Sequence, residues 1–241
     1  MAQKEMAGRL LFSFGVIADV QYADIDDRQN FNKTIWRHYR EALSGLKQAV
    51  AFWNDKSPTK VSFVLQLGDI IDGFNTETNS SQVALETVLK AFEAFSGPVH
   101  HTLGNHELYN FTHAQLLHSD LNSSPLENQE QKNSVERKGY YFFSPHKNFL
   151  IVMLDTYEIS VLGYDKEHPA YKEGIALLNS KNPNAVKNSP VGLRGTDRRF
   201  CAFNGGLCKE QLEWLDTVLT KADKDKQHVV VVGMCKFYWG L

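Results

Sequence analysis

Along the N-terminal part of the chain, short apolar runs typical of strands alternate with longer segments whose apolar residues have helical spacing. Short apolar runs at residues 10–18, 61–67 and 98–102 have the length of buried strands. At residues 31–53 and 83–95, apolar side chains recur every three or four positions, as on the buried face of a helix. The order strand, helix, strand, helix, strand predicts a parallel α/β sheet covered by helices.

The rest of the chain predicts further strands and helices around one long irregular segment. Aromatic-rich runs at 140–143 and 149–154 predict a hairpin that continues a sheet. Residues 156–203 contain three prolines and many polar residues, which predicts a long surface insertion, and loops of that length are usually functional. A helix is predicted at 211–221 and a final buried strand at 229–232.

The composition is that of a globular protein, since 42% of the 241 residues are hydrophobic and 22% are charged. We interpret residues 1–241 as a single domain. The net charge of −2 lacks the basic excess of proteins that bind nucleic acids, so no nucleic-acid partner is expected. No apolar run approaches the roughly 18 residues that a membrane span requires, and no membrane association is expected.

Three cysteines, Cys201, Cys208 and Cys235, all lie late in the chain. Their odd number and their spacing indicate neither a disulfide framework nor a structural zinc site. We therefore expect a reducing compartment, the cytoplasm. The protein is also expected to be a monomer.

Three polar clusters directly follow the first three predicted strands: Asp19-Val20-Gln21, Gly68-Asp69-Ile70-Ile71-Asp72 and Gly104-Asn105-His106-Glu107. In open α/β sheets, the loops at the carboxyl ends of neighbouring strands meet at one crevice, where ligands bind. The order of the elements therefore predicts that five side chains lie together, namely those of Asp19, Gln21, Asp69, Asn105 and His106.

Most of these side chains offer oxygen atoms, which points to a metal site. Asp19 and Asp69 are carboxylates, and Gln21 and Asn105 add amide oxygens. Such a set favours Mg²⁺ or Mn²⁺ over zinc. Asp69 belongs to the central cluster and is suited to bridge two ions, and a hydroxide held between two metals is a strong nucleophile at neutral pH.

This series of motifs, D-x-[H/Q], G-D-x-x-D and G-N-H-E, resembles the calcineurin-like metallophosphoesterases. Gln21 stands where most members have His, and residues 17–24 (Ile-Ala-Asp-Val-Gln-Tyr-Ala-Asp) and 203–206 (Phe-Asn-Gly-Gly) are similar to the manganese-dependent ADP-ribose/CDP-alcohol diphosphatases. The similarity runs from about residue 10 to 232. It implies an α/β fold, a calcineurin-like β-sandwich flanked by helices.

The resemblance also implies a role for each donor. Asp19, Gln21 and Asp69 would bind a first Mn²⁺ ion, and Asp69 and Asn105 a second, with Mg²⁺ as a substitute. The implied reaction is hydrolysis of the diphosphate bond of ADP-ribose, CDP-choline, CDP-glycerol and related small-molecule nucleotides. It would yield a nucleoside monophosphate and a phosphorylated alcohol or sugar.

Two further residues take part in the chemistry that the resemblance implies. His106 would face the substrate and stabilise or protonate the leaving oxygen. Asp72 would hold the imidazole in the required orientation.

The C-terminal part departs from the family pattern, which has a His after a late strand and a Gly-His-x-His further on. Met234 stands at the first of these positions, and the sequence ends at Leu241. The resemblance therefore implies a domain that lacks its C-terminal part, with an exposed sheet edge, a weakened second metal site and weak activity. Truncation or alternative splicing would explain such a chain.

Other functions stay open at this stage. One is a catalytically impaired isoform that binds a nucleotide or a partner, or that folds poorly. A cyclic-nucleotide phosphodiesterase or a phosphomonoesterase would use the same metal loops.

The sequence says less about recognition of the substrate. Phe31 and Tyr22 follow the first metal loop and are candidates to stack on a nucleobase, although Phe31 also fits the apolar face of a helix. Leu193, in the long insertion, is a candidate for a lid over the base.

Several other polar residues are expected to have structural roles. His100 and His101 are neighbours on a strand and should point to opposite faces. Glu107 is expected to support its own loop, and His113 to lie on the surface.

Overall fold

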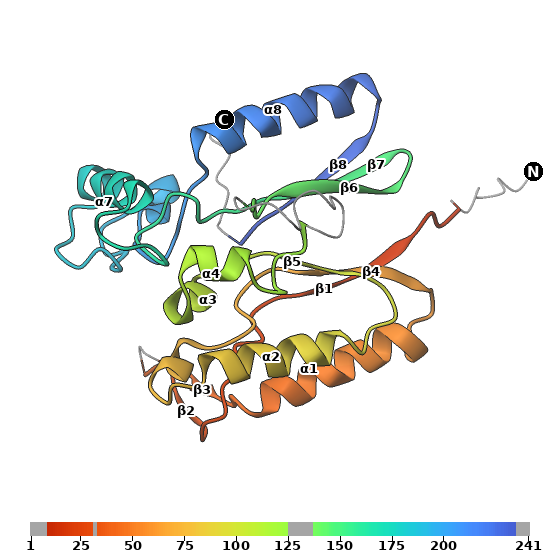
Figure 1. Cartoon of the computed structure of the whole chain (residues 1–241), viewed down its shortest axis with the longest axis horizontal. Helices are drawn as coiled ribbons and strands as arrows, with labels where there is room; N and C mark the ends of the chain where they lie inside the picture. Colours follow the sequence, from red (N-terminus) through yellow and green to blue (C-terminus); the bar gives the residue numbers. More distant parts are fainter. Residues whose placement is uncertain (1–8, 31–32, 125–136, 235–241) are drawn as a thin grey trace, which may run out of the picture.

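The computed structural model describes residues 9–30, 33–124 and 137–234, which form four layers (Figure 1). Helices α1 (Glu41–Ala51) and α2 (Ser81–Phe92) cover one face of a first sheet, and a second sheet lies against its other face. Helix α8 (Lys209–Lys224) covers the outer face of that second sheet. This arrangement is a β-sandwich flanked by helices, as predicted.

The first sheet contains β1 (Ser13–Ile17), β4 (Val61–Gln66) and β5 (Val99–His101) in the order β1-β4-β5. Both pairs of strands are parallel, so the predicted parallel sheet is confirmed. Parallel pairing brings the carboxyl ends of all three strands to the same edge.

The predicted hairpin forms from β6 (Tyr141–His146) and β7 (Phe149–Met153), which pair in antiparallel fashion. It belongs to a second sheet, in which β8 (His228–Val232) pairs in parallel with β7.

Helix α2 (Ser81–Phe92) matches its prediction, but the helix predicted at 31–53 is wrong at its start. Helix α1 spans Glu41–Ala51 and continues as a π-helical turn at Phe52–Lys56. Before it, β3 (Trp36–Arg37) pairs with β2 (Arg28–Gln29). Ile35 fits the helical spacing by position alone, since it is 62% exposed and does not face the core.

Three apolar layers hold the four structural layers together. Side chains alternate along the strands, so each buried strand contributes to two of them. On β4, Val64 packs against the helices, whereas Phe63 and Leu65 face the second sheet. On β7, Ile151 faces the first sheet and Val152 faces α8. Strands β4 and β7 are thus buried on both faces. The predicted burial of β1 and β8 is wrong, because both lie at sheet edges and leave Val16 and Val230 51% and 37% exposed.

The segment predicted as a surface insertion, residues 156–203, is in part a packed unit. It contains helix α7 (Pro169–Lys181) and the short 3₁₀ helix η3 (Gly195–Arg199). Tyr157 and Asn182 within it are buried, with exposures of 1% and 0%. Its prolines do not mark a continuous loop, because Pro169 occupies the first turn of α7, where its missing N–H has no cost.

His113 is buried, and its predicted surface position is wrong. It lies in α4 (His113–Leu117), 7% exposed, with Nε2 at 2.6 Å from Asp155 Oδ2. Burial alone lowers the pKa of His113, but the neighbouring Asp155 carboxylate outweighs burial and raises the pKa above its ordinary value. No sequence pattern predicts this pair, because His113 and Asp155 are far apart along the chain.

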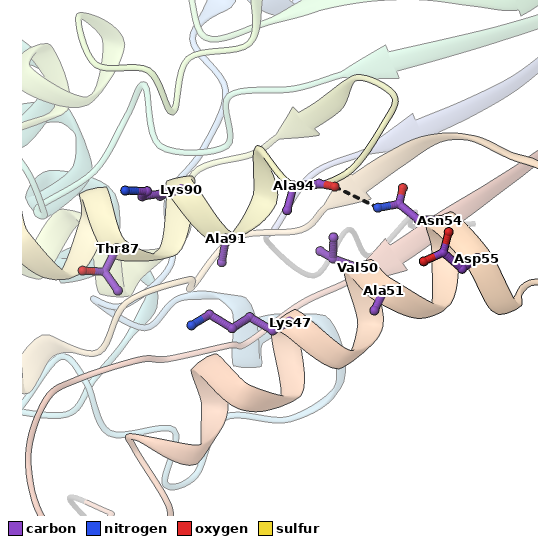
Figure 2. Close-up of a pocket in the computed structure, with 9 residues that line it drawn as sticks. All are labelled: Lys47, Val50, Ala51, Asn54, Asp55, Thr87, Lys90, Ala91 and Ala94. Atoms are coloured by element: carbon purple, nitrogen blue, oxygen red, sulfur yellow. Dashed lines mark hydrogen bonds between the residues drawn. The ribbon is translucent and has the colours of Figure 1, made fainter.

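A groove of about 530 Å³ runs between α1 and α2 (Figure 2). Its lining includes Lys47, Thr87 and Lys90, and the Asn54 side-chain amide donates to the Ala94 carbonyl near one end. The lining residues all come from the two helices and the turns that follow them, so this groove is separate from the strand-end loops.

None of the helices in the described ranges combines the length and the hydropathy that a membrane-spanning segment requires.

His100 and His101 on β5 point to opposite faces, as predicted. His100 Nδ1 lies 2.8 Å from the Tyr141 hydroxyl, in the layer between the sheets. His101 Nδ1 lies 3.1 Å from Gln66 Oε1, and its ring contacts Phe92 on the helical side. Burial lowers the pKa of His100 to about 4 and that of His101 to about 3.

This burial predicts a loss of stability on acidification below the ordinary histidine pKa. Between pH 6.5 and 5 the unfolded chain binds protons at His100 and His101 that the folded chain does not, which costs roughly 2 kcal/mol per histidine. Chemical denaturation of the wild type and of the His100→Gln/His101→Gln variant measures the difference. Acidification has the opposite effect on stability at Glu107, because the pKa of this carboxyl group is raised in the folded protein. Glu107 is present in both proteins and so does not affect the comparison. Equal pH slopes in the two proteins would contradict the prediction.

Candidate metal centre

The loop after β1 and the loop after β4 lie side by side and are joined by backbone hydrogen bonds. The Asp19 amide donates to the Gly68 carbonyl at 3.2 Å, and the Gln21 amide to the Asp69 carbonyl at 2.9 Å. The loop after β5 packs closely on the second, because a Cβ atom on Gly104 would lie only 2.2 Å from Asp69 Oδ1. Parallel pairing of the strands thus brings the three motifs together, as predicted.

The backbone of this cluster adopts an uncommon conformation. Asp19, Gln21 and Asp69 have φ values of 55°, 47° and 56°, in the left-handed region. Residues other than glycine rarely adopt this region, and such strain is concentrated at functional sites, where it directs side chains into a required position. Three of the predicted metal ligands therefore carry backbone strain.

The side chains of the predicted ligands take part in separate hydrogen bonds within the three loops. Gln21 Nε2 donates to Asp19 Oδ1 at 3.1 Å, and the His106 amide donates to Asp69 Oδ1 at 2.9 Å. Asn105 donates through Nδ2 to the Tyr109 hydroxyl at 2.9 Å. That bond turns the amide so that its Oδ1 is the atom left to accept or coordinate.

The electrostatics of the group favour a cation. Asp69 is 3% exposed, and burial raises the pKa of its carboxyl group; Asp19 and Asp72 raise it further, while His106 lowers it. Carboxylates crowded in this way are stabilised by a positive ion between them. The donors are oxygen atoms, which suit Mn²⁺ or Mg²⁺. Across the described ranges, no three His, Cys, Asp or Glu side chains are placed to hold a metal ion together, so the predicted site depends on the amides of Gln21 and Asn105 as well.

Glu107 holds the second and third loops in register. Its carboxylate is fully buried and accepts hydrogen bonds from the amides of Asp69 (2.9 Å), Ile70 (2.7 Å) and Gly104 (2.7 Å). Burial and, to a smaller extent, the charge of Asp69 raise its pKa to about 7, although the backbone hydrogen bonds oppose the rise. The sequence predicts support of its own loop, and the structure adds support of the neighbouring loop that carries Asp69.

His106 and Asp72 lie next to each other beside the ligand cluster. His106 Nδ1 is 3.3 Å from Asp72 Oδ2 and 3.2 Å from the Gly73 amide. The other oxygen of Asp72 accepts from the Phe74 amide at 2.9 Å, at the start of the 3₁₀ helix η2 (Gly73–Thr76). Burial lowers the pKa of His106, but Asp72 and Asp69 outweigh it and raise the pKa. This is the arrangement expected if Asp72 positions the imidazole.

Arg37 is a site residue that sequence reasoning did not find. Its Nη1 atom contacts Gln21 Oε1 and lies 3.4 Å from Asp72 Oδ2. The arginine belongs to β3, far from the motifs in sequence, and only the tertiary structure brings it there. It engages the oxygen of Gln21 that the sequence predicts as a metal ligand.

A cavity of about 370 Å³ adjoins the cluster at Asn105. Its other lining residues come from the 156–203 segment, the turn that follows it, and the end of β8: Tyr157, Pro190, Arg198, Arg199, Phe203, Asn204 and Met234. The long segment therefore reaches the predicted site.

The order, spacing and placement of these motifs agree with the pattern of one known family, the calcineurin-like phosphoesterases, which matches residues 12–238. The chain belongs to the calcineurin-like phosphoesterase family. It is 45% identical over 233 residues to a protein from Bos taurus and 45% identical over 232 residues to one from Homo sapiens, both named manganese-dependent ADP-ribose/CDP-alcohol diphosphatase. These matches cover 95% of this chain and 68% and 67% of the relatives.

Among solved structures of the family, the chain resembles the crystal structure of a dimetal phosphatase from Danio rerio. The TM-score is 0.80 at 40% sequence identity, over 92% of this chain and 69% of the other. A likeness of this degree confirms the calcineurin-like fold.

Met234 occupies the position at which the family resemblance expects a histidine. It follows β8, packs against the apolar layer between the first sheet and helices α1 and α2, and lines the same cavity as Asn105. A thioether is a soft ligand that oxygen-preferring metals do not favour. The side chain reaches the edge of the site without offering the nitrogen that the family pattern expects.

The substrate-binding roles predicted for Tyr22, Leu193 and Phe31 stay predictions. Tyr22 packs against the apolar layer between the first sheet and helices α1 and α2, and its backbone pairs with that of Ile71. Leu193 lies in the insertion but does not line the cavity beside Asn105. Phe31 lies outside the described residues, so its role stays a prediction.

Proposed function

We propose that this protein hydrolyses the diphosphate bond of ADP-ribose, CDP-alcohols and related nucleotides with Mn²⁺ as cofactor. The observation that carries the proposal is the strained cluster of oxygen donors at the strand ends, with His106 beside it. Relatives at 45% identity are named for this activity. The products are a nucleoside monophosphate and a phosphorylated alcohol or sugar.

In this proposal Asp19, Gln21 and Asp69 hold one Mn²⁺ ion, and Asp69 and Asn105 hold a second. Bound Mn²⁺ supplies positive charge for the phosphoryl oxygens and lowers the pKa of bound water. Mg²⁺ has the same preference for oxygen ligands and is the expected substitute. For Gln21 to bind metal through its oxygen, Arg37 must give up its contact with that atom.

His106 acts on the leaving group in the proposed reaction. Asp72 lies on the Nδ1 side of its ring, so Nε2 is the atom available to the leaving oxygen. The raised pKa of His106 keeps the imidazole able to donate a proton near neutral pH.

Met234 favours a second candidate function, a member of the family with weak catalysis. A thioether at the edge of the cavity replaces a nitrogen ligand, which lowers the affinity of the second metal position most. Such a protein would bind nucleotide and one Mn²⁺ ion firmly but turn over slowly.

Calorimetric titration with Mn²⁺ and a hydrolysis assay distinguish these functions. The diphosphatase is expected to bind two ions and to release AMP from ADP-ribose but not from 2′,3′-cyclic AMP. One bound ion with hydrolysis near background would favour the weak form. Faster cleavage of cyclic nucleotides or simple phosphomonoesters than of ADP-ribose would overturn the proposed substrate class.

A further inference from the structure

Two arginines line the cavity beside Asn105 and have no carboxylate partner among the described residues. Arg198 and Arg199 belong to η3, and the side chains of both are exposed. The ion pairs of the described ranges include neither of them, although Arg199 also lies near the Phe200 ring at 4.9 Å. Two positive charges therefore remain available to an anion that enters this cavity.

Hydrogen bonds from a buried asparagine hold the segment that carries the two arginines. Asn182, which is 0% exposed, donates through Nδ2 to the carbonyls of Phe200 at 2.7 Å, Lys187 at 3.2 Å and Ser189 at 3.3 Å. These bonds fasten the chain before and after η3 to the end of α7. A binding group on such a supported segment loses less conformational entropy when its ligand arrives.

The turn with Phe203 and Asn204, which also lines the cavity, is held in place as well. The Tyr157 hydroxyl donates to the Phe203 carbonyl at 3.3 Å. Gly205 lies against the backbone of Thr156, and a Cβ atom there would be 2.3 Å from the Thr156 carbonyl oxygen. The turn with Phe203 and Asn204 is therefore tied to the segment that follows β7.

The chemistry of the cavity suits a phosphoryl group. Guanidinium groups match the geometry of phosphate oxygens and form paired, charge-assisted hydrogen bonds with them. Asn105, which lines the same cavity, is a predicted metal ligand, so one cavity offers a metal position and two guanidinium groups to the two phosphoryl groups of one ligand. Two adjacent phosphoryl groups are what separates a diphosphate from a simple phosphate ester.

We propose that Arg198 and Arg199 bind the phosphoryl group that is not attacked, and so make the site selective for diphosphates over esters with a single phosphoryl group. The inference rests on the proposed function and deepens it by assigning its specificity. The two arginines act on binding, so their removal should raise KM for diphosphates and leave the hydrolysis of single phosphodiesters unchanged.

Equilibrium binding of two nucleotides tests the assignment. The probes are α,β-methylene-ADP, whose bridge resists hydrolysis, and AMP, each titrated calorimetrically with Mn²⁺ present. We expect Arg198→Gln and Arg199→Gln each to weaken binding of α,β-methylene-ADP about tenfold, in line with the loss of a charged hydrogen bond. Binding of AMP should change less than about twofold.

Arg194→Gln is the matched control, because Arg194 is exposed at the start of η3 and does not line the cavity. It makes the same change of charge and should leave both affinities unchanged. An equal loss for both nucleotides, no loss for either, or the same loss in Arg194→Gln would overturn the inference. Circular dichroism melting of each variant should match the wild type, since the replaced groups are exposed.

Kinetics separate failure of this inference from failure of the proposed function. We expect KM for ADP-ribose to rise about tenfold in Arg198→Gln and Arg199→Gln, with partial recovery in Arg198→Lys and no change for bis(4-nitrophenyl) phosphate. If the wild type hydrolyses ADP-ribose and the variants keep its KM, the inference fails alone. If the wild type does not hydrolyse ADP-ribose but the variants still bind α,β-methylene-ADP more weakly than the wild type, the proposed function fails alone.

Discussion

Replacing Asp69 with Asn is expected to remove the stabilisation that Mn²⁺ gives the protein and to abolish hydrolysis of ADP-ribose. Asp69 is the donor proposed to serve both metal positions, and an amide supplies neither its charge nor its second oxygen ligand. A metal at one hundred times its Kd stabilises a protein by about 2.7 kcal/mol. For a chain of this length, that corresponds to roughly 5–10 °C in melting temperature.

Thermal melting of wild type and Asp69→Asn, with and without Mn²⁺, measures this effect. Without metal the variant should be at least as stable as the wild type, because burial raises the pKa of the Asp69 carboxyl and makes its charge costly. Asp216→Asn, at an exposed position on α8, is the control and should keep the full metal response. A full Mn²⁺ response in Asp69→Asn would contradict the proposed site.

Replacing Glu107 with Ala is expected to destabilise the protein even in the absence of metal. The change leaves the amides of Asp69, Ile70 and Gly104 buried without an acceptor. Each unpaired buried donor costs about 1–3 kcal/mol, and after relaxation we expect a total of about 4 kcal/mol. The melting temperature should fall by roughly 8–16 °C.

Differential scanning calorimetry of the metal-free protein measures this loss. Glu107→Gln keeps one carbonyl oxygen and should fall between the wild type and Glu107→Ala. Glu173→Ala, at an exposed position on α7, is the matched control and should melt within about 1–2 °C of the wild type. A similarly small change in Glu107→Ala would show that the loops do not depend on this carboxylate.

The candidate site follows from the sequence to the extent that it depends on the order of elements. Asp19, Asp69 and Asn105 each come directly after a short apolar run, and parallel pairing carries the ends of those runs to one edge. Side-chain contacts play no part in this, and the three motifs lie together in the structure for the same reason.

Contacts between distant segments escape the same reasoning. Arg37 reaches Gln21 and Asp72 from a short strand that periodicity predicts as part of a helix. Arg198 and Arg199 lie in a polar stretch without a motif, and their place beside Asn105 depends on how α7 packs.

Periodicity also fails where local spacing and burial disagree. Ile35 has the spacing of a helix but faces solvent, and α1 begins only at Glu41. His113 is polar and isolated in sequence, yet Asp155 compensates for its burial.

By itself, the sequence determined the short apolar runs that form the strands and the motifs at their ends, but not which strands lie exposed at a sheet edge, as β1 and β8 do. Hydrophobic burial over a run of four to eight residues is a local property that the chain displays directly. Only the tertiary structure decided which charged groups meet in space, because a pair such as Glu107 with the Asp69 loop is set by the packing of separate segments. It also decided the pKa of each group, since desolvation and neighbouring charge do not exist until the chain has folded.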